Sequence, residues 1–334
     1  MEKPGKSSAE SDKPRTPQHV YSDSSTDGAV ESLTKANEAR LEKVIWWKVD
    51  MYILPASILI YLLSWIDRTN IGNARVAGLQ DDLQLTPTEY SIALTITFIP
   101  YILIELPSNL ILKIVGPNIL LPTLLVCWGI VSTLQGVVEN YSGFIACRFF
   151  LGFFEGGLFP GLVLYLSCFY PRDLLQLRIS ALFSSVALSG AFSGLLATAI
   201  SKMDGVGNRP AWAWIFILEG LFTIVFGILS FWIPPQSPDT AWFLSSEEKA
   251  YVTQRLKEAN SAGRDDLGQF SWREVGEAFK SPHIWFLAVN TFFGSAIVYA
   301  LAYFAPSIVF TLGFSPIRTQ LMSVPPFAAA FIGT

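Results

Sequence analysis

Two opposite charges lie within one long apolar stretch, residues 148–161, which reads RFFLGFFEGGLFPG. On a helix, Arg148, Gly152 and Glu155 fall at i, i+4 and i+7 and therefore share one face. A charged side chain at the bilayer centre costs roughly 2.5–3.5 kcal/mol on insertion scales. Two such charges on one face indicate a polar interior shared with other helices. We interpret them as part of a proton or ion site in a transport pathway; the alternative is a structural ion pair that fixes helix packing.

Small residues accompany these charges. Gly152 and Gly156 lie four residues apart, and Gly190 and Gly194 repeat this spacing in a later apolar segment. Small residues at that spacing let a second helix approach closely in lipid. We therefore expect helix packing at all four glycines, and we expect Pro160 to interrupt the helix at the far end of the first segment.

The composition is that of a membrane protein. Hydrophobic residues make up 51% of the 334 residues and charged residues 15%, against about 25% charged in a soluble domain. The two histidines cannot form a metal cluster, and no Gly-Lys phosphate loop is present. We therefore expect no cofactor, no nucleic-acid partner and no enzymatic activity.

Seven apolar segments are long enough to cross a bilayer, and an eighth begins near Ile317. Thr86-Pro87 and Ser315-Pro316 each supply an N-cap residue followed by a proline at the first helical position. We predict an all-α polytopic membrane protein in contact with the lipid bilayer. The seven predicted spans cover about residues 51–66, 89–115, 119–138, 143–169, 177–200, 212–233 and 283–309.

Polar segments divide these spans into domains. Residues 1–43 are too polar to bury a core, and we expect a disordered cytosolic tail there. Residues 44–235 are expected to form a six-helix bundle, and residues 282–334 to supply the first helices of an incomplete second bundle. Between them, residues 236–281 are expected to form a cytosolic loop with short helices, marked by the capping boxes Ser245–Glu248 and Ser271–Glu274.

Basic residues predict the orientation in the membrane. With the N-terminus in the cytoplasm, 17 of the 23 Lys and Arg residues lie on the cytoplasmic side, in the tail, the loops and the long central segment. Cytoplasmic loops carry an excess of such residues. We therefore expect a multi-pass protein with a cytoplasmic N-terminus.

One motif resembles a known family. Residues 65–74, WIDRTNIGNA, are similar to the signature after helix one in fungal organic-anion permeases of the allantoate and nicotinate type. These belong to the anion:cation symporter branch of the major facilitator superfamily. The pattern Arg148-x3-Gly152-x2-Glu155-Gly156 and the segment 214–220 also fit this branch, whereas residues 113–118 lack the acid of the superfamily's inner-gate motif.

The resemblance implies the major facilitator fold, with an N-terminal six-helix bundle and the start of a second. It implies proton-coupled symport of a small organic anion across the plasma membrane by a monomer. That fold has twelve spans, so it also implies that this chain is a fragment or a truncated product. Nicotinate, allantoate, pantothenate and similar carboxylates all remain open as substrates. The alternatives are a non-transporting sensor or receptor with the same fold, or an inactive fragment.

Site residues follow from the resemblance and from charge. An organic carboxylate needs a cationic partner, and Arg68 resembles the substrate-binding arginine of the wider branch. The alternative is an interfacial arginine held by lipid phosphate or by Asp67. Proton coupling needs a carboxylate near a switchable cation, and Asp67 and Glu155 fit, with Arg148 as that cation.

Four further residues are weaker candidates. Asn290 and Tyr299 are predicted to face the pathway and bind substrate from the second half, although such residues more often serve packing. Glu105 and Glu219 also lie in apolar segments. For these two acids we favour packing against backbone or a position near the membrane interface.

Overall fold

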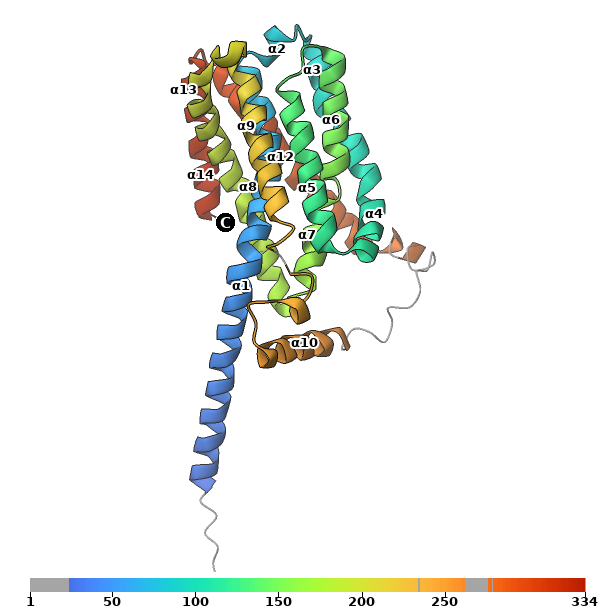
Figure 1. Cartoon of the computed structure of the whole chain (residues 1–334), viewed down its shortest axis with the longest axis vertical. Coiled ribbons are helices and arrows are strands. Elements are labelled where there is room, and N and C mark those ends of the chain that lie inside the picture. Colours follow the sequence, from blue (N-terminus) through green and yellow to red (C-terminus); the bar gives the residue numbers. More distant parts are fainter. Residues whose placement is uncertain (1–23, 234, 262–275, 278, 334) are drawn as a thin grey trace, which may run out of the picture. The chain divides into compact units, whose positions relative to one another are not determined.

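The computed structural model describes residues 24–233, 235–261, 276–277 and 279–333, and the regular structure in those ranges is helical. The described residues after Trp46 form one compact unit, which contains the membrane helices (Figure 1). Within these ranges, seven stretches are long and apolar enough to cross a membrane, which confirms the seven predicted spans. These stretches are α1 (Ser24–Val76, with the candidate span from Arg40), α3 (Pro87–Ile96) with α4 (Phe98–Val115), α5 (Pro117–Gln135), α6 (Tyr141–Glu155) with α7 (Leu158–Ser167), α8 (Arg172–Ile200), α9 (Ala211–Leu229) and α12 (Pro282–Phe310).

Shorter elements connect or follow these helices. α2 (Leu79–Asp82) precedes α3, and Thr86 caps α3 with Pro87 at its first position, as predicted. Ser315 and Pro316 likewise begin the helix that follows α12. The remaining elements are η1 (Ser201–Met203), η2 (Val206–Asn208), η3 (Pro238–Thr240), α10 (Ser246–Ser261), α13 (Pro316–Met322) and α14 (Val324–Gly333).

The first helix begins earlier than the sequence pattern indicates. We expected residues 1–43 to be disordered, but α1 already begins at Ser24. Residues 29–43 are rich in Ala, Glu, Lys, Leu and Arg, which have high helix propensity. A segment without a hydrophobic core can still form a helix where its residues have high helix propensity. Residues 1–23 lie outside the described residues.

Several predicted spans are broken within the membrane region. The second span divides at Thr97, the fourth at Gly156 and Gly157, and the eighth at Ser323. The sequence pattern placed the interruption of the fourth span at Pro160, but α6 already ends at Glu155. Pro160 lacks an N–H group, so the carbonyl of Gly156 loses its i+4 donor. The helix therefore breaks one turn before the proline, directly after a functional candidate.

The four predicted packing glycines all lie at close helix contacts. An added Cβ at Gly152 would collide with the carbonyl of Thr97, and one at Gly156 would lie 2.5 Å from the carbonyl oxygen of Tyr101. These contacts join the end of α6 to the break at Thr97 and to the first turn of α4. On α8, a Cβ at Gly190 would overlap the Phe327 ring. A Cβ at Gly194 would lie 2.9 Å from the carbonyl oxygen of Gln320, at the contact with α13.

Helices α5 and α9 also pack closely and run side by side (Figure 1). An added Cβ at Gly129 would lie 2.9 Å from the carbonyl oxygen of Gly220, and Gly220 in turn faces the backbone of Thr133. Small residues on both helices permit this approach. The contact holds the residue before Gly220, Glu219, in the interior of the bundle.

In the central loop, α10 begins with the predicted capping box. Ser245 N–H donates to Glu248 Oε2 at 2.9 Å, and Glu248 N–H donates to Ser245 Oγ at 3.3 Å. The second predicted capping box, Ser271 with Glu274, lies outside the described residues. Lys48 Nζ on α1 also lies 2.5 Å from Glu248 Oε1. The start of α10 is therefore tied to the first membrane helix.

Removing this tie should loosen α10. The Lys48 ammonium, together with the Ser245 N–H, holds the pKa of Glu248 below its ordinary value of 4.5. The stabilisation that ionised Glu248 gives to the start of α10 is therefore present at neutral pH and is lost as the pH falls through that lowered pKa. We expect Lys48→Met to reduce amide exchange protection in the first turn of α10 at pH 7 by about 0.2–1 kcal/mol, as for other partly exposed ion pairs. Lys249→Met is the matched control, and equal effects of both substitutions would contradict the prediction.

Candidate functional site

One stretch of α1, residues 64–73, sends polar side chains toward several neighbouring helices. Asp67 faces α5, where Ser132 Oγ donates a hydrogen bond to Asp67 Oδ1 at 2.8 Å. Asn70 and Asn73 face α8. Ser193 Oγ donates to Asn70 Oδ1 at 2.8 Å, and Asn73 Nδ2 donates to Ser193 Oγ at 2.7 Å. The polar motif of α1 therefore fixes its rotation within the bundle.

Arg68, on another side of α1, forms a buried ion pair with Glu155 of α6. The distance from Arg68 Nη2 to Glu155 Oε1 is 2.8 Å, and the side chains are 9% and 1% exposed. Ser64 Oγ donates a hydrogen bond to the same carboxylate oxygen, and Arg68 Nη1 donates to Tyr299 Oη at 3.2 Å. These contacts satisfy both charges, as a buried ion pair requires. Glu155 therefore meets its cationic partner on another helix.

Aromatic rings surround the Arg68 guanidinium. Its central carbon lies 4.9 Å from the ring centroid of Trp65, 5.4 Å from that of Tyr101 and 5.8 Å from that of Tyr299. Cations are attracted to ring faces at such distances, most strongly where water is excluded. The rings therefore help to hold the cation in place, and Tyr299 also accepts a hydrogen bond from it through its hydroxyl group.

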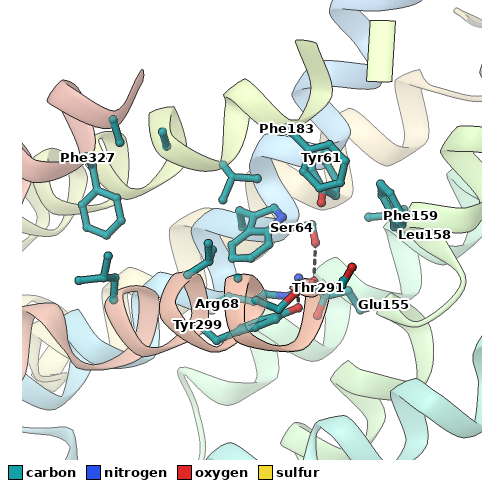
Figure 2. Close-up of a pocket in the computed structure, with 18 of the residues that line it drawn as sticks. Tyr61, Ser64, Arg68, Glu155, Leu158, Phe159, Phe183, Thr291, Tyr299 and Phe327 are labelled. Atoms are coloured by element: carbon teal, nitrogen blue, oxygen red, sulfur yellow. Dashed lines mark hydrogen bonds and ion pairs between the residues drawn. The ribbon is translucent and has the colours of Figure 1, made fainter. Parts of the chain in front are cut away.

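The ion pair lies in the wall of a cavity of about 680 Å³ (Figure 2). Arg68 and Glu155 are the charged members of the described lining, and much of the remainder is aromatic or aliphatic. Asn290 and Tyr299 reach the cavity from α12. A mostly apolar pocket with a few converging polar groups is typical of small-molecule sites. Further lining side chains are Tyr61, Ser64, Trp65, Tyr101, Phe159, Phe183, Thr291 and Phe327.

The predicted site residues divide between this cavity and the interior of the bundle. Arg68, Glu155, Asn290 and Tyr299 line the cavity together. Arg148, 3% exposed, lies instead with its guanidinium carbon 5.3 Å from the Phe144 centroid and 5.6 Å from that of Phe216. Within the described parts of the chain, its Nε and Nη2 have no hydrogen-bond partner.

Asp67 is the other predicted residue outside the cavity lining. Its carboxylate points toward α5, where Ser132 binds it, and it is 4% exposed. Electrostatic interaction still links Asp67 with both Arg148 and Glu155. The three predicted proton-coupling residues therefore interact electrostatically, but of the three only Glu155 lines the cavity.

Comparison with known proteins identifies the family. The Major Facilitator Superfamily profile matches residues 57–334. The chain belongs to the major facilitator superfamily. Among its relatives, the high-affinity nicotinic acid transporter of Saccharomyces cerevisiae is 36% identical over 285 residues, which cover 85% of this chain and 53% of that protein. An uncharacterized transporter of Schizosaccharomyces pombe is 36% identical over 289 residues, covering 86% of this chain and 58% of the relative.

Solved structures show the same facilitator fold. A bacterial homologue of the human lysosomal transporter Spinster, inward-facing and unoccupied, aligns with a TM-score of 0.67 at 18% identity, covering 85% of this chain and 60% of that one. The D-xylose-proton symporter aligns with a TM-score of 0.63 at 16% identity, over 84% of this chain and 66% of that one. The chain therefore spans little more than half the length of the curated relatives described above.

Several residues of the site in this facilitator chain were missed by sequence reasoning. Ser64 had a usable signal, because it lies one helical turn before Arg68 and shares its face. Tyr101 and Ser132 had none, because each reaches the α1 motif across a helix contact. Glu219, 8% exposed, is more deeply buried than the interfacial position considered from sequence.

Proposed function

We propose that this protein takes part in secondary active transport, as a proton-coupled symporter of a small organic anion across the plasma membrane. The observation that carries the proposal is the Arg68–Glu155 ion pair in the wall of the cavity. A cation that already holds one carboxylate can hold a second in its place. The similarity to a nicotinic acid transporter supports a carboxylate as substrate.

The proposed coupling is an exchange of carboxylates at Arg68. When Glu155 takes up a proton, its negative charge is lost and its attraction to Arg68 weakens. The guanidinium fork can then bind the carboxylate of the substrate through two charge-assisted hydrogen bonds. When the substrate leaves, Glu155 gives up its proton and pairs with Arg68 again. One proton and one anion therefore enter and leave the site together.

The other lining residues suit the remainder of the substrate. The Asn290 amide and the Tyr299 hydroxyl supply neutral hydrogen-bonding groups from α12. Tyr61 and Trp65 of α1 add aromatic surface to the lining, which favours a planar or apolar body attached to the carboxylate. The Trp65 ring stacks against that of Tyr299, with 5.3 Å between the ring centroids. We propose that Asp67 and Arg148 act indirectly, through their charge interactions with Glu155.

Uptake of a labelled carboxylate panel by cells expressing the full-length protein tests this function. We expect saturable uptake of at least one small carboxylate, stimulated by an acidic exterior and abolished by a protonophore. The neutral amide of the same compound, such as nicotinamide beside nicotinate, is the matched control. Equal uptake of acid and amide, or uptake that does not respond to a pH gradient, would contradict the proposal.

We also propose that the N-terminus and residues 236–281 are cytoplasmic, with the bundle of residues 44–235 between them and residues 282–334 belonging to a second bundle. The excess of Lys and Arg on that side supports this. Single cysteines at Asp81 and Glu247, both exposed, can be introduced after Cys127, Cys147 and Cys168 are replaced by serine. An impermeant thiol reagent should label Asp81→Cys in intact cells and Glu247→Cys only after permeabilisation. The reverse pattern would invert the orientation.

A further inference from the structure

Glu219 on α9 is a buried acid for which the coupling scheme above has no use. It is the single charged residue between Ala211 and Leu229, and it is 8% exposed. Both of its carboxyl oxygens are buried, and neither has a hydrogen-bond partner among the described residues. Packing against backbone, which we favoured from sequence, would have supplied a donor to at least one of them. The carboxyl group therefore needs another explanation.

Within the described residues, helices α5 and α8, which pack against α9, offer Glu219 no basic partner. Arg148 of α6 contacts α9 at Phe216, with its guanidinium carbon 5.6 Å from the ring centroid, but it forms no hydrogen bond with Glu219. α5, the helix packed most closely against α9, contains no charged residue from Pro117 to Gln135. α8 carries its charged residues, Arg172, Asp173 and Arg178, in its first two turns, at the opposite end from its contact with the start of α9. Lys202 in η1 is exposed. Among the described residues, Glu219 interacts electrostatically with a second acid, Asp67 of α1.

Asp67 has more groups that stabilise a negative charge than Glu219 has. Its Oδ1 accepts the hydrogen bond from Ser132, while its Oδ2 is buried and lacks a partner within the described chain. Arg148 interacts with Asp67 as an opposite charge and Glu155 as a like charge. Of the two neighbouring acids, Asp67 is therefore the one whose negative charge has a donor and a cation to stabilise it.

A count of the buried charges leads to the same assignment. Among the described residues, three arginines are buried, Arg68, Arg148 and Arg178, and three acids, Asp67, Glu155 and Glu219. Arg178 is paired with the partly exposed Asp50, with 2.8 Å between Nη2 and Oδ2. Arg68 is paired with Glu155, and Arg148 opposes Asp67. The third acid has no cation to balance it. An isolated ionised carboxylate in an apolar interior is so costly that such a group takes up a proton instead.

We propose that Glu219 is a proton-binding site, and that with Asp67 and Arg148 it forms a proton site inside the first bundle, separate from the cavity. The pair of acids binds one proton, held by Glu219, and carries one negative charge on Asp67, which the Arg148 guanidinium balances. The three residues come from α9, α1 and α6, all within the first six spans. The inference therefore does not depend on the identity of the transported anion.

Infrared spectroscopy of the purified chain tests this assignment directly. A protonated carboxylic acid has a carbonyl stretching band well separated from the bands of a carboxylate, and a detergent without ester or acid groups leaves that region clear. At pH 7 we expect one such band in the wild type, its complete loss in Glu219→Gln and its retention in Asp67→Asn. Glu105→Gln, a half-buried acid on α4, is the matched control and should leave the band unchanged.

Isotope labelling keeps the test decisive where a variant does not fold. Uniform ¹³C-glutamate should shift the band of the wild-type chain to lower frequency, and ¹³C-aspartate should not. Absence of the band in the wild type, its persistence in Glu219→Gln, or a shift with labelled aspartate alone would overturn the proposal. The measurement involves no transport, so its failure is distinguishable from a failure of the uptake experiments.

Discussion

In the full-length protein, Glu155→Gln is expected to uncouple the proposed transport from protons without preventing substrate exchange. Glutamine has the shape of a protonated glutamic acid and cannot ionise, so Arg68 would be permanently free to hold a substrate carboxylate. Exchange of labelled for unlabelled substrate across the membrane should continue. Accumulation driven by a pH gradient should disappear, whereas the wild type gains roughly tenfold in accumulation for each pH unit if one proton accompanies each anion.

Proteoliposomes with a defined pH on each side allow both measurements on one preparation. The amide oxygen introduced by Glu155→Gln can still accept the Ser64 hydrogen bond, so the variant should retain its fold, which size-exclusion chromatography can check. Glu105→Gln is again the matched control, because Glu105 lies in a membrane helix but not in the cavity lining. Uphill accumulation by Glu155→Gln with an unchanged pH dependence would show that the role of Glu155 is structural.

The sequence identified the buried charged residues, but not the side chains on other helices that they contact. Arg148 and Glu155 stood out because charges are rare in apolar segments, and their spacing correctly placed them on one buried face. Seven residues separate them by about 10 Å along the helix axis, which ruled out a relaxed direct pair. Which side chain each one meets depends on helix packing, and the spacing within one helix contains no information about that.

Local sequence chemistry predicted the helix starts, but not the position of the helix break or the surroundings of Glu219. Thr86-Pro87 and Ser315-Pro316 placed helix starts correctly, because an N-cap residue and a following proline act within a few residues. The Thr86 side chain caps its helix, whereas the Ser315 side chain makes no capping hydrogen bond. The break at Gly156 was misplaced, because a proline disturbs the turn that precedes it. The unpartnered carboxyl of Glu219 had no sequence signal beyond its charge. Its isolation depends on the absence of charged residues from α5, and the neighbouring helix is known only from the fold.

Arg68→Ala is expected to abolish both binding and transport. The substrate carboxylate would lose two charge-assisted hydrogen bonds, each contributing about 1.5–3 kcal/mol, so affinity should fall by roughly 100-fold or more. The substitution also leaves Glu155 buried without its cation, which destabilises a protein by about 3–5 kcal/mol. Loss of binding alone would therefore not separate a substrate role from a folding role.

The double variant Arg68→Ala/Glu155→Gln separates these two roles. Glutamine removes the uncompensated charge, so thermal stability should recover toward that of the wild type, while substrate binding should not. Arg68→Lys should fold and keep the ion pair with Glu155, but it should bind substrate at least tenfold more weakly, because an ammonium lacks the bidentate fork. Direct binding of a labelled carboxylate to the purified full-length protein measures all three. If the double variant binds substrate as tightly as the wild type, Arg68 serves to neutralise Glu155, and the anion is held by another group in the cavity.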